Sequence, residues 1–192
     1  MTEGRDRVRS ESTWTAPSDD CPNPELWHAP DRAATEVEVS QFMGALCTVL
    51  RPRRVLETGA YRGHSSREMG RALVGVGHLD TLEVDPIMAA ETRSRVEGLP
   101  VTVHEVSSLE FTPAEPLELI FFDSEYELRP MEVERFKRFA SNRCVWAVHD
   151  SRHDGLYAAL DELRQRGTIT EPLHLPTPRG LALGRYVDPG RP

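Results

Sequence analysis

Apolar and polar positions alternate along the chain with two different periods, and the pattern predicts helices and strands in turn. Between residues 33 and 50 the apolar side chains recur at helical spacing, and Pro52 ends this predicted helix. From that proline onward, short apolar runs alternate with amphipathic segments. The predicted strands lie at 55–56, 78–84, 101–103, 117–122, 144–148, near Ile169 and at 181–187. The predicted helices between them lie at 65–74, 86–97, 131–140 and 156–163.

This order of elements predicts an α/β fold. Strands that alternate with helices form a parallel sheet with helices on both faces. The last strand follows a link that contains Pro176 and Pro178 and is too short for a crossover helix, so we expect that strand to be antiparallel. The prediction is one domain over residues 33–192, with a mostly parallel, seven-stranded sheet.

Residues 1–32 precede this domain and are mostly polar, without a periodic apolar pattern. Such composition is typical of a flexible arm. Trp14 and Trp27 stand in this arm and are available to close over a ligand. We therefore expect the arm to act as a lid.

Composition narrows the class of protein. The net charge is −8, from 23 basic and 31 acidic residues, which makes a nucleic-acid backbone a poor partner. No apolar run approaches the length needed to span a bilayer. Cys21, Cys47 and Cys144 are odd in number, form no C-x-x-C pair and follow no signal peptide, so we expect free thiols in a reducing cytoplasm.

The turn after the first strand carries two glycines at an unusual spacing. Gly59 permits the tight strand-to-helix turn, and Gly63 leaves room for a ligand where a side chain would otherwise stand. Glu57 ends the strand, and the serines that open the next helix, Ser65 and Ser66, suit a helix N-terminus. The spacing differs from G-x-G-x-x-G, which argues against an NAD-dependent oxidoreductase.

Polar residues follow each of the first five strands. Ligands of open α/β sheets bind at the carboxyl ends of the strands, so these residues are the candidate site. They are Glu57, Gly59 and Gly63 after the first strand, Glu83 and Asp85 after the second, Ser107 and Ser108 after the third, Asp123 after the fourth, and His149 and Asp150 after the fifth. The acid-rich stretch 125–134 is interpreted instead as the solvated start of a helix.

The segment 53–66 resembles the first motif of class I S-adenosylmethionine-dependent methyltransferases. The segments 119–126, 145–151 and 177–183 are similar to a small-molecule O-methyltransferase subfamily, which includes macrolide sugar O-methyltransferases and cephalosporin-hydroxylase-like proteins. The resemblance covers about residues 33–187. It implies a Rossmann-like methyltransferase domain that transfers a methyl group from S-adenosylmethionine to a small molecule, with a hydroxyl oxygen of a specialised metabolite as the favoured acceptor. The short chain leaves little insert for a substrate cap, so the arm, the helix at 33–50 and a second subunit of a homodimer are the candidates for the lid.

The resemblance also implies roles for individual residues. Glu57 would handle the methionine end of the cofactor, Glu83 would accept both ribose hydroxyls, and Ser107 stands where many relatives keep an aspartate on the adenine. The full set of implied cofactor-binding residues is Glu57, Gly59, Tyr61, Gly63, Ser65, Ser66, Glu83, Ser107, Ser108 and Asp123.

Two alternatives stay open for the site after the fourth and fifth strands. Metal-using relatives hold a divalent cation at the positions of Asp123, His149 and Asp150, although a histidine suits ions softer than Mg²⁺. Otherwise Asp123 binds cofactor or substrate directly, and His149 is the general base. Tyr126 stands where relatives often keep a basic group, which directs attention to His149 or His153 for proton removal.

Two further functions compete with methyl transfer. The fold could serve only to bind the cofactor or a partner protein, or it could hold the cofactor for a different reaction. Glu57 and Glu83 favour retained cofactor affinity.

Overall fold

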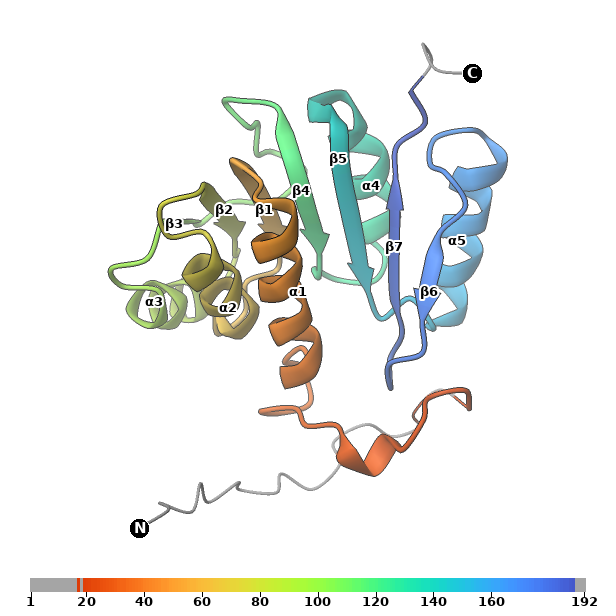
Figure 1. Ribbon diagram of the computed structural model, residues 1–192, viewed down its shortest axis with the longest axis horizontal. Helices are drawn as coiled ribbons and strands as arrows, with labels where there is room; N and C mark the ends of the chain where they lie inside the picture. The colour runs from red at the N-terminus through yellow and green to blue at the C-terminus, as the bar shows by residue number, and fades with distance from the viewer. Residues whose placement is uncertain (1–16, 18, 189–192) are drawn as a thin grey trace.

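A computed structural model describes residue 17 and residues 19–188, and in this range seven strands form one sheet (Figure 1). The strands are β1 (Arg54–Thr58), β2 (His78–Leu82), β3 (Val101–His104), β4 (Leu117–Phe122), β5 (Ala140–His149), β6 (Leu173–Leu175) and β7 (Leu181–Arg185). Their order across the sheet is β3-β2-β1-β4-β5-β7-β6. The first five strands pair in parallel, whereas β7 is antiparallel to both β5 and β6.

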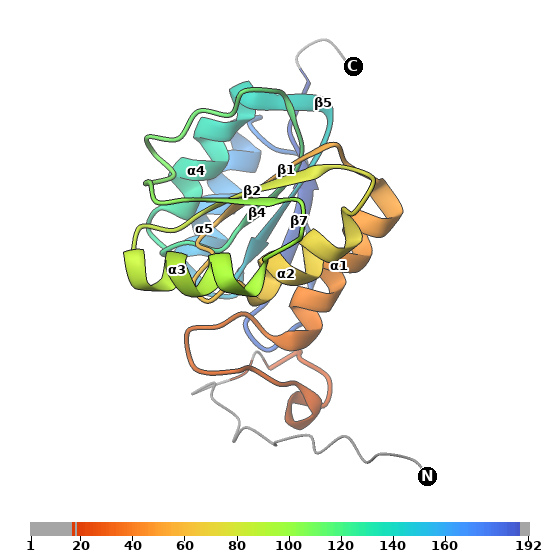
Figure 2. The same ribbon diagram turned by 90° about the vertical axis from the view of Figure 1, so that its left-hand side faces the viewer.

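Helices cover both faces of the sheet (Figure 2). They are α1 (Val37–Leu50), α2 (His64–Ala72), α3 (Pro86–Arg95), α4 (Arg129–Phe136) and α5 (Asp154–Gln165), with short 3₁₀ turns η1 (Pro24–Leu26) and η2 (Lys137–Phe139). On one face Met43 of α1 and Met69 of α2 pack against the sheet. On the other, Phe136 of α4 and Leu160 of α5 form a second apolar core with the central strands.

The predicted α/β fold and its antiparallel last strand are confirmed. The prediction of a strand near Ile169 is wrong, because Ile169 forms only an isolated bridge with Tyr186. The strand in this region is β6, whose Leu173 is 61% exposed. Ile169 instead enters the apolar core, so its burial and not strand pairing explains its apolar character.

Several helices begin a few residues from the predicted start, and two of these differences involve the site. The first helix begins at Val37 and not at residue 33, because the preceding residue Glu36 has a non-helical backbone, with φ −55° and ψ 141°, and a side chain that is fully buried. The helix after β4 begins at Arg129 and not at 131, and Arg129 is itself buried. Both differences involve a residue, Glu36 or Arg129, whose polar side chain points into the candidate site.

The strand register places the predicted site residues along one edge of the sheet. Thr58 pairs with Leu82 on one side and with Phe122 on the other, and Phe122 pairs with Val148. The residues that follow these strands therefore lie next to one another. The chain that precedes α1 passes below this edge in the view of Figure 1.

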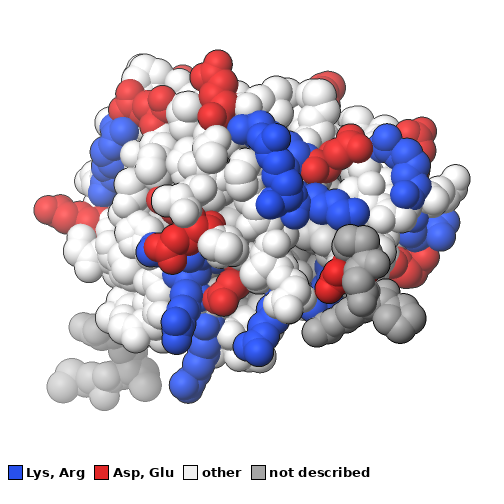
Figure 3. Space-filling view, turned by 90° about the horizontal axis from the view of Figure 1, so that it is seen from above, with Lys and Arg blue, Asp and Glu red and all other residues white. Residues whose placement is uncertain are grey.

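Figure 3 shows the end of the molecule that lies opposite the carboxyl ends of the parallel strands. Acidic and basic side chains are interspersed over this end. Within the described range, none of the helices combines the length and the apolar character that crossing a bilayer requires. The three cysteines are buried and form no disulfide.

Candidate functional site

A groove of about 480 Å³ lies at the carboxyl ends of the strands. The predicted site residues that line it are Gly59, Tyr61, Glu83, Asp85, Ser107, Ser108, Asp123 and Asp150. Its volume suits a ligand of cofactor size. A larger hollow of about 610 Å³ lies outside α2 and α3, is open to solvent and contains none of the predicted residues.

The loop after β1 is held in place by a close approach of two backbones. Gly59 has a φ of 77°, and a Cβ atom there would collide with the backbone of Asp123 and Ser124. Tyr61 has a φ of 48°, and its backbone N–H donates to Glu83 across the groove. The strand-end loops of β1, β2 and β4 thus support one another.

Glu83 combines fixed geometry with access to the groove. Its Oε2 accepts a hydrogen bond from the N–H of Tyr61 at 2.7 Å, and its Oε1 accepts one from the N–H of Asp85 at 2.9 Å. A carboxylate has about four acceptor sites, so two remain for a ligand. The Glu83 carboxylate therefore has the orientation and the free lone pairs that a ribose diol needs.

Glu57 lies behind the groove and not on its lining, in contrast to the contact expected with the methionine end of the cofactor. Its side chain is fully buried and accepts hydrogen bonds from Ser65, Ser66 and Thr81. Burial raises the pKa of Glu57 to about 7, although those three hydrogen bonds lower it. Of the two serines, only Ser65 lines a cavity, a small one of about 20 Å³ beside Gly59 and Asp123.

Gly63 also serves a purpose other than the predicted one. A Cβ at this residue, whose φ is 74°, would lie 2.8 Å from the Cγ2 of Thr92 on α3. The space that glycine leaves is therefore filled by helix α3. Gly63 lets α2 and α3 pack closely and is not among the residues that line the groove.

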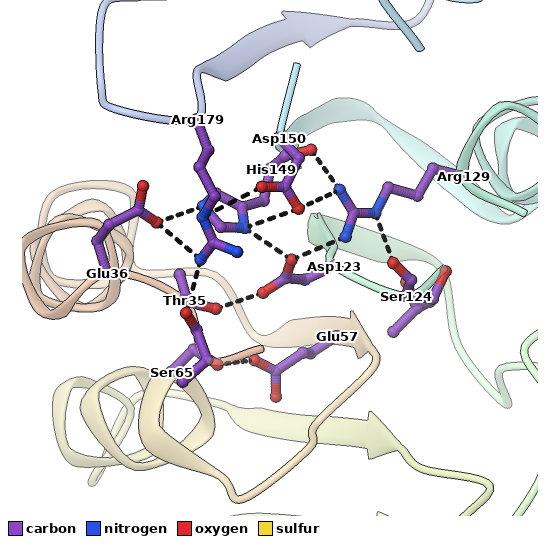
Figure 4. A network of polar contacts seen from close by, with 12 residues as sticks. Thr35, Glu36, Glu57, Ser65, Asp123, Ser124, Arg129, His149, Asp150 and Arg179 are labelled. Carbon is purple, nitrogen blue, oxygen red and sulfur yellow. Dashed lines mark hydrogen bonds and ion pairs between the residues drawn. The ribbon is translucent and has the colours of Figure 1, made fainter. Parts of the chain in front are cut away.

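Asp123, His149 and Asp150 come together as predicted, with ligand atoms within 4.8 Å of one another. His149 is almost fully buried, and both of its ring nitrogens face carboxylates. Nδ1 donates to Oδ1 of Asp123 at 2.8 Å, and Nε2 donates to Oε2 of Glu36 at 2.5 Å (Figure 4). Both nitrogens are thus donors, as in an imidazolium.

The surroundings of His149 decide its protonation. Burial alone would lower the pKa of His149, but the charges of Asp150, Asp123 and Glu36 together raise it to about 10. Burial would raise the pKa of Glu36, yet His149 and Arg179 lower it to about 2. His149 therefore carries a proton at neutral pH and does not have the ionisation expected of a general base.

Arg129 enters the same cluster from the first position of α4. Its Nη1 donates to Oδ2 of Asp150 at 2.8 Å, and its Nη2 donates to Oδ1 of Asp123 at 3.2 Å (Figure 4). The same guanidinium is anchored on two backbone carbonyls, those of His149 at 2.6 Å and Ser124 at 2.7 Å. The stretch 125–134 is therefore not a solvated helix start, since Arg129 is 3% exposed and Glu132 is fully buried.

Arg179 closes the cluster from the loop between β6 and β7. Its Nη2 donates to Oε2 of Glu36 at 3.1 Å and to the carbonyl of Ala34 at 2.6 Å. Its Nε lies 3.3 Å from Oδ1 of Asp150, whose φ of 54° is a conformation that aspartate tolerates. Burial raises the pKa of Asp150, but His149, Arg129 and Arg179 outweigh it and lower that pKa.

The sequence did not reveal four members of this cluster as site residues: Thr35, Glu36, Arg129 and Arg179. Thr35 donates to Oδ2 of Asp123 from 88 residues away. Two signals were available, an arginine in the first turn of a helix, where a cation is disfavoured by the helix dipole, and an arginine beside Gly180 in the segment 177–183.

The described end of the N-terminal arm contacts the groove. Arg32 lines it, and Asp31 accepts a hydrogen bond from the hydroxyl of Tyr61 at 3.3 Å. Trp27 is partly buried against the core beneath α1. Trp14 lies outside the described residues. The function of the arm as a lid stays a prediction.

Tyr126 and His153 flank the groove on its α4 side. Their rings stack with centroids 4.6 Å apart and an interplanar angle of 8°, and the guanidinium of Arg129 lies 5.0 Å from the Tyr126 ring centroid. The charge of Asp150, followed by burial, raises the pKa of Tyr126. Tyr126 is therefore a lining residue and not a substitute for the basic group that relatives carry.

Comparison with known proteins gives the class of the fold. No model of a protein family matches the sequence. The structure of the O-methyltransferase TomG of Streptomyces achromogenes, in complex with SAM, superposes with a TM-score of 0.72 at 20% identity over 83% of each chain. An O-methyltransferase of Bacillus cereus in complex with SAH gives a TM-score of 0.68 at 19% identity, over 78% of this chain and 80% of that one. The fold is that of the class I S-adenosylmethionine-dependent methyltransferases.

One similarity extends to the sequence. The chain is 27% identical over 141 residues to the catechol O-methyltransferase of Niastella koreensis, an alignment that covers 68% of this chain. The alignment spans 59% of the relative, less than two thirds of its length. Among proteins with this fold, the chain is thus similar to O-methyltransferases.

Proposed function

We propose that this protein transfers the methyl group of S-adenosylmethionine to a hydroxyl oxygen of a small molecule. One observation carries the proposal. A single groove joins Glu83 and the Gly59 loop, where a nucleoside would bind, to Asp123 and its charged neighbours, where an acceptor would react. The similarity to O-methyltransferases supports oxygen as the acceptor atom.

The cofactor would occupy the β1–β2–β4 side of the groove. Glu83 would accept the two ribose hydroxyls, and Ser107 and Ser108 would hold the adenine beside apolar groove residues such as Val106. Gly59, Ser65 and Asp123 would hold the methionine end. Glu57, Ser66 and Gly63 act indirectly, because they fix the turn on which these contacts depend.

The reaction is an in-line displacement at the methyl carbon. Bound S-adenosylmethionine would supply a sulfonium-activated methyl group for attack by the acceptor oxygen, S-adenosylhomocysteine would be the leaving group, and the acceptor hydroxyl would lose its proton. Asp123 is the proton acceptor in this proposal, since its carboxylate lines both the groove and the small cavity beside Ser65. His149 is the positioning residue that holds Asp123 through a 2.8 Å hydrogen bond. Most of the rate enhancement then comes from alignment of the two reactants.

We also propose a cellular compartment, a role for the N-terminal arm, a substrate class and an oligomeric state. The buried, unpaired cysteines support a reducing compartment such as the cytoplasm. Arg32 and Asp31 support a lid role for the arm, since they already meet the groove and Tyr61. A specialised metabolite as substrate follows from the family resemblance, and a homodimer would supply a second subunit to cover the substrate in a chain this short.

The proposal is tested by incubation with S-adenosylmethionine and hydroxylated acceptors, with catechol as the first because of the Niastella koreensis relative. Mass spectrometry should detect S-adenosylhomocysteine and a methylated acceptor in equal amounts. The Asp123→Asn variant is the control for contaminating enzymes. Absence of acceptor-dependent S-adenosylhomocysteine across phenols, catechols and sugar hydroxyls would show that the fold serves another purpose.

A further inference from the structure

We propose that the guanidinium of Arg129 stands where a divalent cation would stand in a metal-using methyltransferase, so that Asp123, His149 and Asp150 bind no metal. The consequence for catalysis, a metal-independent methyl transfer, rests on the function proposed above. The assignment of Arg129 itself rests only on the geometry of the cluster.

The guanidinium already makes the contacts that a metal would need. Its two terminal nitrogens bridge the carboxylates of Asp150 and Asp123, at 2.8 Å and 3.2 Å. A cation between two neighbouring carboxylates relieves their repulsion, and a planar guanidinium does so with fixed directions. The side chain of Arg129 is 4% exposed, so this bridge lies out of bulk water.

The other donors of the cluster are also engaged. Both ring nitrogens of His149 already contact carboxylates, with Nδ1 at 2.8 Å from Asp123 and Nε2 at 2.5 Å from Glu36. The second oxygen of Asp123 accepts from Thr35. The second oxygen of Asp150 accepts no hydrogen bond from the described residues, but it lies within ion-pair distance of Arg179, 3.3 Å from its Nε. A metal would have to displace several of these contacts to acquire a first coordination shell.

A divalent ion would add positive charge that the cluster cannot neutralise. Three carboxylates, those of Glu36, Asp123 and Asp150, already face the guanidinium groups of Arg129 and Arg179 and the imidazole of His149. Even with a neutral imidazole, three carboxylates against two guanidinium groups and a divalent ion would leave a buried surplus of one positive charge. Buried charges without partners are strongly disfavoured, so the arrangement opposes metal entry.

Arg129 is also prevented from leaving the cluster. Two backbone carbonyls hold it, those of Ser124 and His149, and the ring of Tyr126 lies beside it. As the first residue of α4, it occupies the positive end of a helix, where only neighbouring carboxylates make a cation favourable. The acids at this edge of the sheet and Arg129 therefore stabilise one another.

Calorimetric titration with Mn²⁺ tests the proposal without any need for turnover. The wild-type protein should show no saturable binding up to about 1 mM, a concentration that saturates ordinary carboxylate sites. The Arg129→Met variant leaves Asp123 and Asp150 without their bridge. It should bind Mn²⁺ with a dissociation constant below about 0.1 mM, which is at least about tenfold tighter than the 1 mM limit expected for the wild type. Arg138→Met, at an exposed arginine of η2, is the matched control and should behave as the wild type.

Both possible failures are informative. Saturable binding by the wild type in the micromolar range overturns the proposal, and so does a folded Arg129→Met variant that binds no better than the wild type. If Arg129→Met does not fold, Arg129→Gln replaces it. The glutamine side chain has no charge but can still donate hydrogen bonds to the carbonyls of Ser124 and His149.

Turnover separates this proposal from the proposed function. After dialysis against EDTA, methyl transfer should stay within about twofold of the untreated rate, and Mg²⁺ should not raise it. Loss of activity on chelation with recovery in Mg²⁺ overturns the Arg129 assignment and leaves the methyltransferase assignment intact. If no acceptor is methylated and the wild type binds no Mn²⁺, the proposed function fails and the Arg129 assignment stands.

Discussion

The Nε2 atom of His149 at the end of β5 lies 2.5 Å from Oε2 of Glu36, which precedes α1 and is 113 residues away in the chain. Both side chains are almost completely buried. This contact ties the N-terminal segment to the strand ends and makes Thr35 and Glu36 part of the site. It also couples the stability of the protein to the ionisation of His149.

Stability should therefore decrease at alkaline pH. The folded-state pKa of His149 is raised to about 10 from an ordinary value of 6.5, so its stabilisation is complete below pH 6.5 and is lost as the pH rises toward 10. Denaturant unfolding between about pH 6 and about pH 9 should show a steeper loss of free energy for the wild type than for His149→Asn. His78→Asn, at a histidine of β2 that bonds Thr102, is the control and should follow the wild type. Parallel pH profiles for the wild type and His149→Asn would contradict the ion-pair account.

Gly59→Ala should destabilise the protein more than Gly75→Ala. Both Gly59 and Gly75 have a positive φ, of 77° and 72°, but a Cβ at Gly75 meets nothing within 4 Å. Gly75→Ala should cost only the backbone strain, about 1–2 kcal/mol. Gly59→Ala adds a collision with Asp123 and Ser124, so we expect at least about twice that cost in thermal or denaturant unfolding. Equal costs would show that the two strand-end loops do not approach as closely as described.

Glu83→Ala should weaken cofactor binding by roughly 1.5–3 kcal/mol, which is the value of hydrogen bonds to a charged group. In calorimetry this corresponds to a loss of affinity of about 10-fold to 150-fold. Glu91→Ala removes a carboxylate from α3 outside the groove and should leave the affinity unchanged. An unchanged affinity in Glu83→Ala would remove that residue from the ribose site.

Asp123→Asn should lower kcat by about 10²–10⁴ while the affinity for S-adenosylhomocysteine changes far less, because a proton acceptor acts mainly in the transition state. Asp80→Asn is the matched control on β2, where the carboxylate bonds His104 and lies outside the groove. A variant Asp123→Asn with wild-type kcat would show that the proton goes elsewhere.

Much of the fold was predictable because the signals are local. The apolar run Leu117–Phe122 predicts a central strand, and the structure places it as β4 with five of its six residues buried. The helix predicted from residue 86 does begin at Pro86, and the structure shows that Asp85 caps it by accepting hydrogen bonds from the N–H groups of Ile87 and Met88. The edge strand β6 was missed because it has only three residues, Leu173–Leu175, and lies between Pro172 and Pro176.

The site was only partly predictable, since the strand ends identify the residues near the groove but not the direction of each side chain. Asp123, His149 and Asp150 do meet, as their strand-end positions imply. The cations that neutralise them, Arg129 and Arg179, come from a helix start and a loop, and charged residues at such places are usually solvated. Only the three-dimensional structure shows that both are directed inward.

The central claim, that the groove at the strand ends is an S-adenosylmethionine site, has a direct test that requires no acceptor. Calorimetric titration of the wild-type protein with S-adenosylmethionine, S-adenosylhomocysteine and NAD⁺ should give one site per chain for the first two, in the low micromolar range, and no heat of binding for NAD⁺. Binding of NAD⁺ in preference to S-adenosylmethionine, or no binding of either methyl-donor species, would contradict the account.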